Sequence, residues 1–191
     1  MSDARQAILE IREAELELVK AREKVLQLRR SVEGRAVKNY KFGTPDGPKR
    51  MADLFDDKED LIVIHNMGKS CTYCTLWGDG FNGLTKHFED RAAFVVASPD
   101  SVEVQQEFAK SRGCTFKMVS CENNNFFDDM GFLNEKERPQ PGISTFSKDY
   151  ADTITRAGAA NIGPGDDFCS TWHILDILKD GDKDWEPKYQ Y

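Results

Sequence analysis

Two cysteines separated by two residues, Cys71 and Cys74, directly follow the apolar run at residues 61–64. A buried strand followed by a helix is predicted there, and thiols at positions i and i+3 of a helix share one face and can close a disulfide. The first thiol would lie at the helix N-terminus, where the dipole and the free N–H groups favour an anion. Because the thiolate is the nucleophile of thiol–disulfide exchange, the spacing predicts Cys71 as the attacking thiol and Cys74 as the resolving thiol.

Three further side chains near the pair are candidate supporting residues. His65 shares one face of the predicted strand with Leu61 and Val63, a pattern that favours a hydrogen-bonded core histidine over a proton shuttle for the dithiol. Trp77 and Asp79 lie on the helix that begins at the motif. A tryptophan at such a position is typical of a core, whereas Asp79 is a candidate proton acceptor for the sulfurs.

A zinc site is a rival interpretation of the cysteine pair. One pair supplies two of the four ligands that a structural zinc ion takes, and no second pair in the sequence has ligand spacing. The other ligands would have to converge from distant positions, namely His65, His87, Cys114, Cys121 or His173. The run at 78–83 reads G-x-G-x-x-G, but it lies within the predicted helix and not at the strand-to-helix turn that a dinucleotide site requires. The sequence therefore predicts no metal and no cofactor.

Composition bounds the partners and the compartment. The chain has 191 residues, with 26 Lys and Arg against 33 Asp and Glu, and a net charge of −7. This acidity argues against nucleic acid or an anionic membrane as a partner. No apolar stretch approaches the ~20 residues of a bilayer span, and the charged N-terminal sequence has no apolar signal core, so we expect a cytoplasmic protein. An odd number of cysteines in that compartment predicts free thiols at rest.

Residues 1–36 are predicted to form an N-terminal helical arm. Within residues 3–33, small and apolar side chains recur at alternating spacings of four and three, which is the seam of a long amphipathic helix. The seam consists of Ala7, Ile11, Ala14, Leu18, Ala21, Val25, Leu28 and Val32. Two interpretations remain open: the helix pairs with a second copy through residues 7–32 to make a homodimer, or it lies back on its own domain.

Residues 37–191 are predicted to form one domain in which strand and helix patterns alternate. The expected elements are a hairpin with its turn at 44–48, strands at 61–67, 94–97 and 115–120, helices at 72–88 and 101–112, a polar loop at 121–140, a hairpin of strands 143–147 and 152–156, and a closing helix at 168–179. This order predicts an α/β fold whose mainly parallel sheet gains an antiparallel edge.

The same order, with the cysteine pair after the first core strand, resembles the thioredoxin fold. It is similar in particular to a bacterial thioredoxin-like family known as domain of unknown function eight-nine-nine. The resemblance covers roughly residues 38–150. It is carried by Tyr40, Phe42, Asp53-Leu54-Phe55, Leu61-Ile62-Val63, His65, Met67, Cys71, Cys74, Trp77, Asp79, Asn82-Gly83, His87, Arg91, Val95-Val96, Ser98, Phe116, Ser120, Gly142, Ser144 and Phe146. It implies a thioredoxin-like domain at 37–191, with a central mixed sheet flanked by helices, and it implies no particular activity.

Two departures from thioredoxins concern the site. Ser70 stands where thioredoxins carry Trp, and Ser144 is matched to their cis-proline, which makes Ser144 a fourth candidate supporting residue. A peroxiredoxin-type site would place Thr or Ser three residues, and Pro seven residues, before its reactive cysteine. Cys71 has Gly68 and Ile64 at those offsets.

These patterns predict a thiol–disulfide oxidoreductase that acts on protein or small-molecule disulfides or thiols, with Cys71 and Cys74 as its catalytic residues. Two alternatives remain. The chain could be a non-enzymatic interaction or dimerisation module in which the dithiol is incidental, or a peroxiredoxin-like peroxide reductase.

Overall fold

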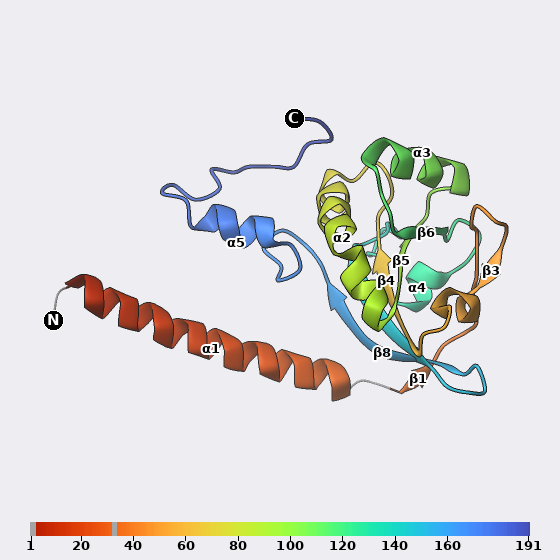
Figure 1. Ribbon diagram of the computed structural model, residues 1–191, viewed down its shortest axis with the longest axis horizontal. Helices are drawn as coiled ribbons and strands as arrows, with labels where there is room; N and C mark the ends of the chain where they lie inside the picture. The colour runs from red at the N-terminus through yellow and green to blue at the C-terminus, as the bar shows by residue number, and fades with distance from the viewer. Residues whose placement is uncertain (1–2, 32–33) are drawn as a thin grey trace.

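A six-stranded mixed sheet forms the centre of the computed structural model, which describes residues 3–31 and 34–191 (Figure 1). The strand order is β1-β8-β7-β4-β5-β6. These strands are β1 (Arg35–Ala36), β4 (Asp60–His65), β5 (Ala93–Ser98), β6 (Lys117–Ser120), β7 (Gly142–Lys148) and β8 (Ile154–Asn161), and a separate hairpin pairs β2 (Lys41–Phe42) with β3 (Lys49–Arg50). The helices are α1 (Asp3–Ser31), the 3₁₀ helix η1 (Met51–Phe55), α2 (Thr72–Arg91), α3 (Val102–Arg112), α4 (Phe126–Asp129) and α5 (Ser170–Asp176).

Strands β4 and β5 lie at the centre of the sheet because their sequences are nearly continuous apolar runs. Every residue of β5 is buried, and β4 pairs with it in parallel, with Val63 opposite Val95. On its other side β4 pairs antiparallel with β7, with Val63 opposite Ser144. Parallel neighbours need a crossover, and α2 supplies it. The first residue of α2 therefore lies close to the C-terminal end of β4.

The two faces of the sheet bury two separate hydrophobic cores, because side chains alternate between the faces along each strand. Ile64 packs with Trp77 of α2 on one face. Val63 packs on the other face, with Phe55 of η1 and Phe126 of α4. Any side chain on β4 therefore meets either α2 or the η1–α4 side, but not both.

The order of the elements agrees with the predicted α/β order, and β7 and β8 form the predicted antiparallel hairpin. The sheet is mixed rather than mainly parallel: β4–β5 and β5–β6 are parallel pairs, whereas β1–β8, β8–β7 and β7–β4 are antiparallel. Some boundaries differ. Strand β8 continues past the predicted 152–156 because the small residues at 157–160 keep pairing with β7. The predicted loop at 121–140 contains α4, whose Phe126 and Phe127 are buried. One helical turn is too short to show a period in the sequence. Helix α5 ends at Asp176, before the predicted 179.

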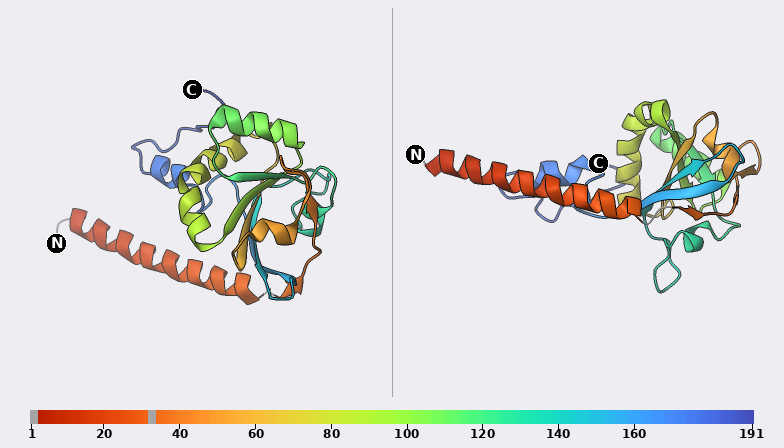
Figure 2. Two further views of the ribbon diagram at one scale, coloured as in Figure 1. Left: turned by 45° about the vertical axis from the view of Figure 1, so that its right-hand side comes forward. Right: turned by 90° about the horizontal axis from the view of Figure 1, so that it is seen from below.

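Helix α1 projects from the sheet, and none of its described residues is buried (Figures 1 and 2). Its second half is tied to the segment before α5. Arg22 donates two hydrogen bonds to the Asp167 carboxylate, over 3.1 and 2.5 Å. The Arg29 guanidinium lies 6.0 Å from the centre of the Phe168 ring. These exposed contacts hold the helix beside its own domain weakly.

Most of the predicted seam of α1 is uncovered. Leu18, in the middle of the seam, is 49% exposed, and Ile11 is 58% exposed. Val32, the last residue of the seam, lies outside the described residues. The contacts with the domain therefore leave the seam available to another partner.

The chain enters the sheet at β1, within the predicted arm 1–36. Arg35 and Ala36 pair antiparallel with residues 155–156 of β8. Within the described ranges, the rest of that edge of β8 has no strand partner. It faces Leu26 and Arg29 of α1 across a cavity of about 350 Å³. A helix thus lies beside the strand edge that β1 is too short to cover.

Gly142, the first residue of β7, lies so close to the Phe132 ring that a Cβ built there would be 1.9 Å from a ring carbon. Gly142→Ala should therefore lower the free energy of unfolding by about 1–3 kcal/mol, the usual cost of overpacking. Gly80→Ala is the matched control, since Gly80 lies inside α2 with open space around it. That substitution should raise the free energy of unfolding by about 0.5–1 kcal/mol. Denaturant unfolding measures both shifts, and shifts of the same sign would contradict the packing at Gly142.

Candidate active site

The loop between β4 and α2 is fixed by two side chains. Asn66 continues the pairing with β5 through its backbone, and its Oδ1 accepts the Gly68 N–H over 2.8 Å. Asp100, just after β5, accepts the Lys69 N–H over 2.7 Å. Gly68 has a φ of +103°, a region that disfavours other residues. The loop therefore presents the next residues in one defined orientation.

Cys71 is the N-cap of α2. Its sulfur accepts the backbone N–H of Cys74 over 3.0 Å, and its backbone is extended, as N-cap residues usually are. Its carbonyl accepts both the N–H and the hydroxyl of Thr75, over 3.1 and 3.0 Å. Cys71 is partly exposed, whereas Cys74 is buried one turn into the helix. The cysteine pair therefore lies at the turn from β4 into α2, as the sequence predicts.

The two thiols have opposite electrostatic environments. The hydrogen bond from the Cys74 thiol, aided by the backbone N–H groups of Cys74 and Tyr73, lowers the pKa of Cys71 to about 7. The negative Cys71 sulfur and burial raise the pKa of Cys74 well above its ordinary value. At neutral pH the geometry therefore favours a thiolate at Cys71 and a protonated thiol at Cys74. All five cysteines of the chain are free thiols in this structure.

His65 and Ser144 lie together on the face of the sheet opposite α2. His65 Nε2 is 2.9 Å from Ser144 Oγ, and Arg156 donates a hydrogen bond to the same oxygen over 3.2 Å. The imidazole is fully buried and stacks on Phe132, with 4.0 Å between ring centres. Burial first, and the Arg156 charge second, hold the pKa of His65 well below its usual range, so the ring is neutral. The structure thus brings these two candidates to each other, and among the described residues neither side chain hydrogen-bonds to Cys71 or Cys74, although His65 and Cys74 line one small cavity.

Trp77 and Asp79 occupy different sides of α2. Trp77 is buried and packs edge-on against Trp172 of α5, with 6.2 Å between ring centres. Asp79 accepts two hydrogen bonds from Arg112 at the end of α3, one of them over 3.1 Å and the other shorter. Its carboxylate is therefore engaged by a guanidinium rather than available to the sulfurs.

The C-terminal segment of the chain is the part of the site's surroundings that the sequence did not indicate. Residues 180–186 are exposed or partly exposed, but Pro187 after them is buried, and the Tyr189 carbonyl accepts a hydrogen bond from Arg112 over 2.7 Å. Burial, with the charges of Cys71 and Cys74 next, raises the pKa of Tyr189. Aromatic residues in an otherwise polar end were the signal that could have revealed this contact.

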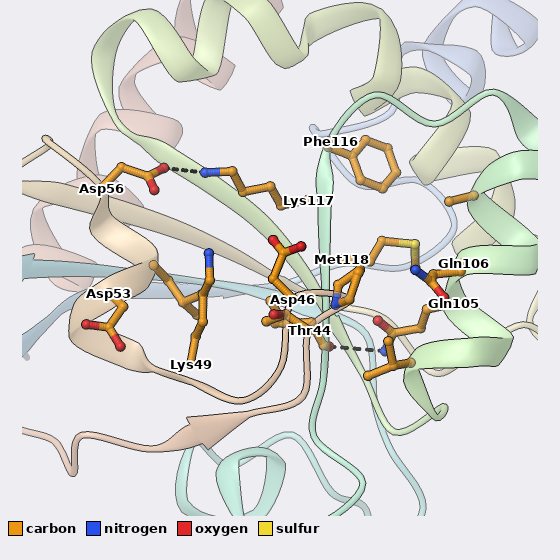
Figure 3. A pocket seen from close by; sticks show the side chains of 15 residues that line it. Thr44, Asp46, Lys49, Asp53, Asp56, Gln105, Gln106, Phe116, Lys117 and Met118 are labelled. Carbon is orange, nitrogen blue, oxygen red and sulfur yellow. Dashed lines mark hydrogen bonds and ion pairs between the residues drawn. The ribbon is translucent and has the colours of Figure 1, made fainter.

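A cavity of about 260 Å³ lies away from the cysteine pair, between the β2–β3 hairpin, η1, α3 and β6 (Figure 3). Phe116 and Met118 line it, and the Lys117–Asp56 ion pair lies at its side. Gln105 enters from α3 and donates a hydrogen bond to the Val119 carbonyl. No residue of α2 and no cysteine lines this cavity, so it belongs to a different part of the molecule.

Metal and membrane features are absent from the part of the chain that the structure describes. Among residues 3–31 and 34–191, no three His, Cys, Asp or Glu side chains gather in a way that could hold a metal ion. Within the same ranges, every helix is too short or too polar to cross a bilayer.

The model of DUF899, a bacterial protein family of unknown function, matches residues 2–191. No curated protein matches the chain.

Several solved structures share the fold. Peroxidoxin BcpB from Mycobacterium tuberculosis is 21% identical, with a TM-score of 0.55 over 68% of this chain and 84% of that one. The bacterioferritin comigratory protein of Xanthomonas campestris is 17% identical, with a TM-score of 0.53 over 64% and 80%. Another peroxiredoxin is 16% identical, with a TM-score of 0.56 over 68% and 83%. At these identities the likeness shows the fold alone, and it confirms the predicted thioredoxin-like fold class.

The pH dependence of Cys71 alkylation tests its electrostatic environment. Because only the thiolate reacts, the rate with iodoacetamide should be half-maximal near pH 7, lower in more acid solution and constant in more alkaline solution. Cys74→Ala removes the thiol donor and should raise the half-maximal pH, while Cys74→Ser keeps a donor and should raise it less. Mass spectrometry of timed reactions gives the profile. A midpoint near the ~8.5 of a free cysteine would contradict the low pKa.

Ser144→Ala tests the separation of the two faces of the sheet. Losing the hydroxyl leaves His65 and Arg156 without their buried partner, which should lower the free energy of unfolding by about 1–3 kcal/mol. The pH profile of Cys71 alkylation should not change. Ser147→Ala, in the same strand, is the control, because no described residue hydrogen-bonds to that side chain. A shifted Cys71 profile in Ser144→Ala would instead connect this residue to the dithiol.

Proposed function

The chain belongs to DUF899, a bacterial family of unknown function, and we propose that it is a thiol–disulfide oxidoreductase. The observation that carries the proposal is the hydrogen bond from the Cys74 backbone N–H to the Cys71 sulfur at the start of α2. That bond and the Cys74 thiol stabilise a thiolate at the partly exposed position and keep the proton on the buried one. Dithiol exchange needs this division of roles.

The reaction proceeds by two displacements at sulfur. The Cys71 thiolate attacks one sulfur of a substrate disulfide, forms a mixed disulfide and releases the first substrate thiolate. Cys74 then attacks the Cys71 sulfur, its proton passes to the departing second substrate sulfur, and the Cys71–Cys74 disulfide forms. The substrate disulfide gains two electrons and the dithiol loses two. A thiol or dithiol reductant reverses the change in the protein, and with an oxidised protein the same steps run backwards.

Trapping with small disulfides tests this function. Reduced protein treated with oxidised glutathione should form an intramolecular Cys71–Cys74 disulfide and release two glutathione thiols. Cys74→Ser should stop at a mixed disulfide on Cys71, because no resolving thiol remains, and Cys71→Ser should form neither product. Cys114→Ser is the matched control and should behave as the unaltered protein. Mass spectrometry after acid quench identifies each species, and equal reaction at all five cysteines would reject the proposal.

Peroxide reduction is the second candidate, and the peroxiredoxin likeness of the fold favours it. In this reaction the Cys71 thiolate attacks one peroxide oxygen, becomes a sulfenic acid and releases an alcohol or water. Cys74 then displaces water to give the same disulfide. Gly68 and Ile64 do not supply the Ser or Thr and Pro of a peroxiredoxin-type site. Oxidation of Cys71 by hydrogen peroxide no faster than that of Cys114 would remove this candidate.

A homodimer through α1 is part of the proposal. The seam of residues 7–32 leaves Ile11 and Leu18 about half exposed, and a second copy of the helix would bury them. The ion pair between Arg22 and Asp167 is exposed and can be given up at little cost. The remaining apolar surface of α1 is then the larger driving force.

Substitutions on opposite sides of α1 test the dimer in the full chain. Leu18→Glu places a charge in the seam, so light scattering should show the mass falling from two chains to one. Leu16→Glu is the control, because Leu16 is 62% exposed and lies outside the seam. It should leave the mass unchanged. A single-chain mass for the unaltered protein would exclude the dimer.

A further inference from the structure

After α5 the chain returns toward α2 and α3 (Figure 1), and its last four residues, 188–191, are exposed. We call residues 185–191 the C-terminal strap. Trp185 packs against Trp172, with 6.1 Å between ring centres, and so joins the core under α2. Pro187, two residues later, is buried. The strap therefore crosses from the α5 side of α2 toward α3 with packed side chains at its start.

A charged anchor holds the far end of the strap. Arg112, the last residue of α3, donates a hydrogen bond from Nη1 to the Tyr189 carbonyl over 2.7 Å. The same guanidinium binds both oxygens of Asp79 on α2. The Arg112 side chain is only 23% exposed, so this bidentate pair is better shielded than an ordinary surface ion pair. One arginine thus connects α2, α3 and the strap.

Charged groups of the strap and of the cysteine motif affect the pKa values of two tyrosines. Tyr73, between the two cysteines, has its pKa raised by burial and by the Glu186 carboxylate of the strap. Tyr189, on the other side, has its pKa raised by burial and by both thiols. Trp185 and Glu186 of the strap line one cavity of about 380 Å³ together with Tyr73, the residue between the two cysteines. Cys71 itself is only partly exposed.

We propose that the C-terminal strap is one wall of the dithiol site and restricts it to small disulfides, thiols or peroxides, excluding the disulfides of folded proteins. This inference rests on the proposed function and names its substrate class. Arg112 and Asp79 are positioning residues, because they hold the strap and touch no reacting atom. A folded protein brings a broad surface to the disulfide it presents, and that surface would meet the strap before its sulfur reached Cys71.

Two reagents with one chemistry and different bulk test the strap. N-ethylmaleimide and a maleimide carrying a long polyethylene glycol chain are reacted separately with Cys71 in the full chain. Arg112→Gln removes the charge-assisted hydrogen bond, so the strap should open more often, and the rate with the bulky reagent should rise roughly tenfold relative to the small one. Arg112→Lys keeps one donor and should give an intermediate ratio.

Arg91→Gln is the matched control. It removes the same charge from the other end of α2, where Arg91 pairs with Asp60 over 2.7 Å, and it should leave the ratio unchanged. If Arg112→Gln does not fold, deletion of residues 187–191 replaces it, and the same rise in the ratio is expected. An unchanged ratio, or an equal rise for both reagents, would overturn the size restriction.

The strap proposal and the oxidoreductase proposal can fail independently of each other. If Cys71 still reacts with a midpoint near pH 7 and the ratio does not move, the strap proposal fails and the dithiol chemistry stands. If the midpoint lies at that of a free thiol and no Cys71–Cys74 disulfide forms, the oxidoreductase proposal fails, whatever the ratio. Turnover of oxidised glutathione compared with that of a disulfide-bonded folded protein completes the test, and preference for the folded protein would overturn the strap proposal.

Discussion

The first backbone N–H groups of α2 have no carbonyl acceptor within the helix, and the Cys71 sulfur accepts one of them. An oxygen-bearing side chain is the usual choice at an N-cap. Here Cys71 takes that place and accepts the Cys74 N–H. The cap that begins the helix is therefore also what favours charge on the sulfur. Helix formation and thiolate stabilisation are one interaction, and a substitution that weakens either weakens both.

This cap depends on the sheet beneath it. β4 must end at His65 for the chain to turn, and β5 must end beside it so that Asn66 and Asp100 can fix the loop. The sheet also divides the polar chemistry of the molecule. The dithiol belongs to the α2 side, while the buried network of His65, Ser144 and Arg156 lies on the other face and serves packing. His65 is close to the cysteines in the sequence, but its side chain packs on the face of the sheet opposite α2.

The sequence could predict the features that depend on local pattern. The apolar runs of β4 and β5, the helix expected at 101–112 and the place of the cysteine pair after a buried strand all follow from local sequence pattern. It could not predict what depends on contacts between distant segments. The bond of Asp79 to Arg112 joins residues 33 positions apart, and the bond of Arg112 to the Tyr189 carbonyl joins residues 77 positions apart. A one-turn helix such as α4 is likewise held by burial of Phe126, since four residues carry too little intrinsic helical preference.

The short strand β1 gives α1 a role besides that of an assembly element. A strand edge with open N–H and C=O groups is a template on which another chain can add a strand, and proteins protect such edges with short strands, charged side chains or a covering helix. β8 has all three of these beside it: the two residues of β1, the arginines Arg29 and Arg30, and the body of α1. The position of α1 therefore leaves less of the β8 edge open to the addition of a foreign strand than β1 alone would.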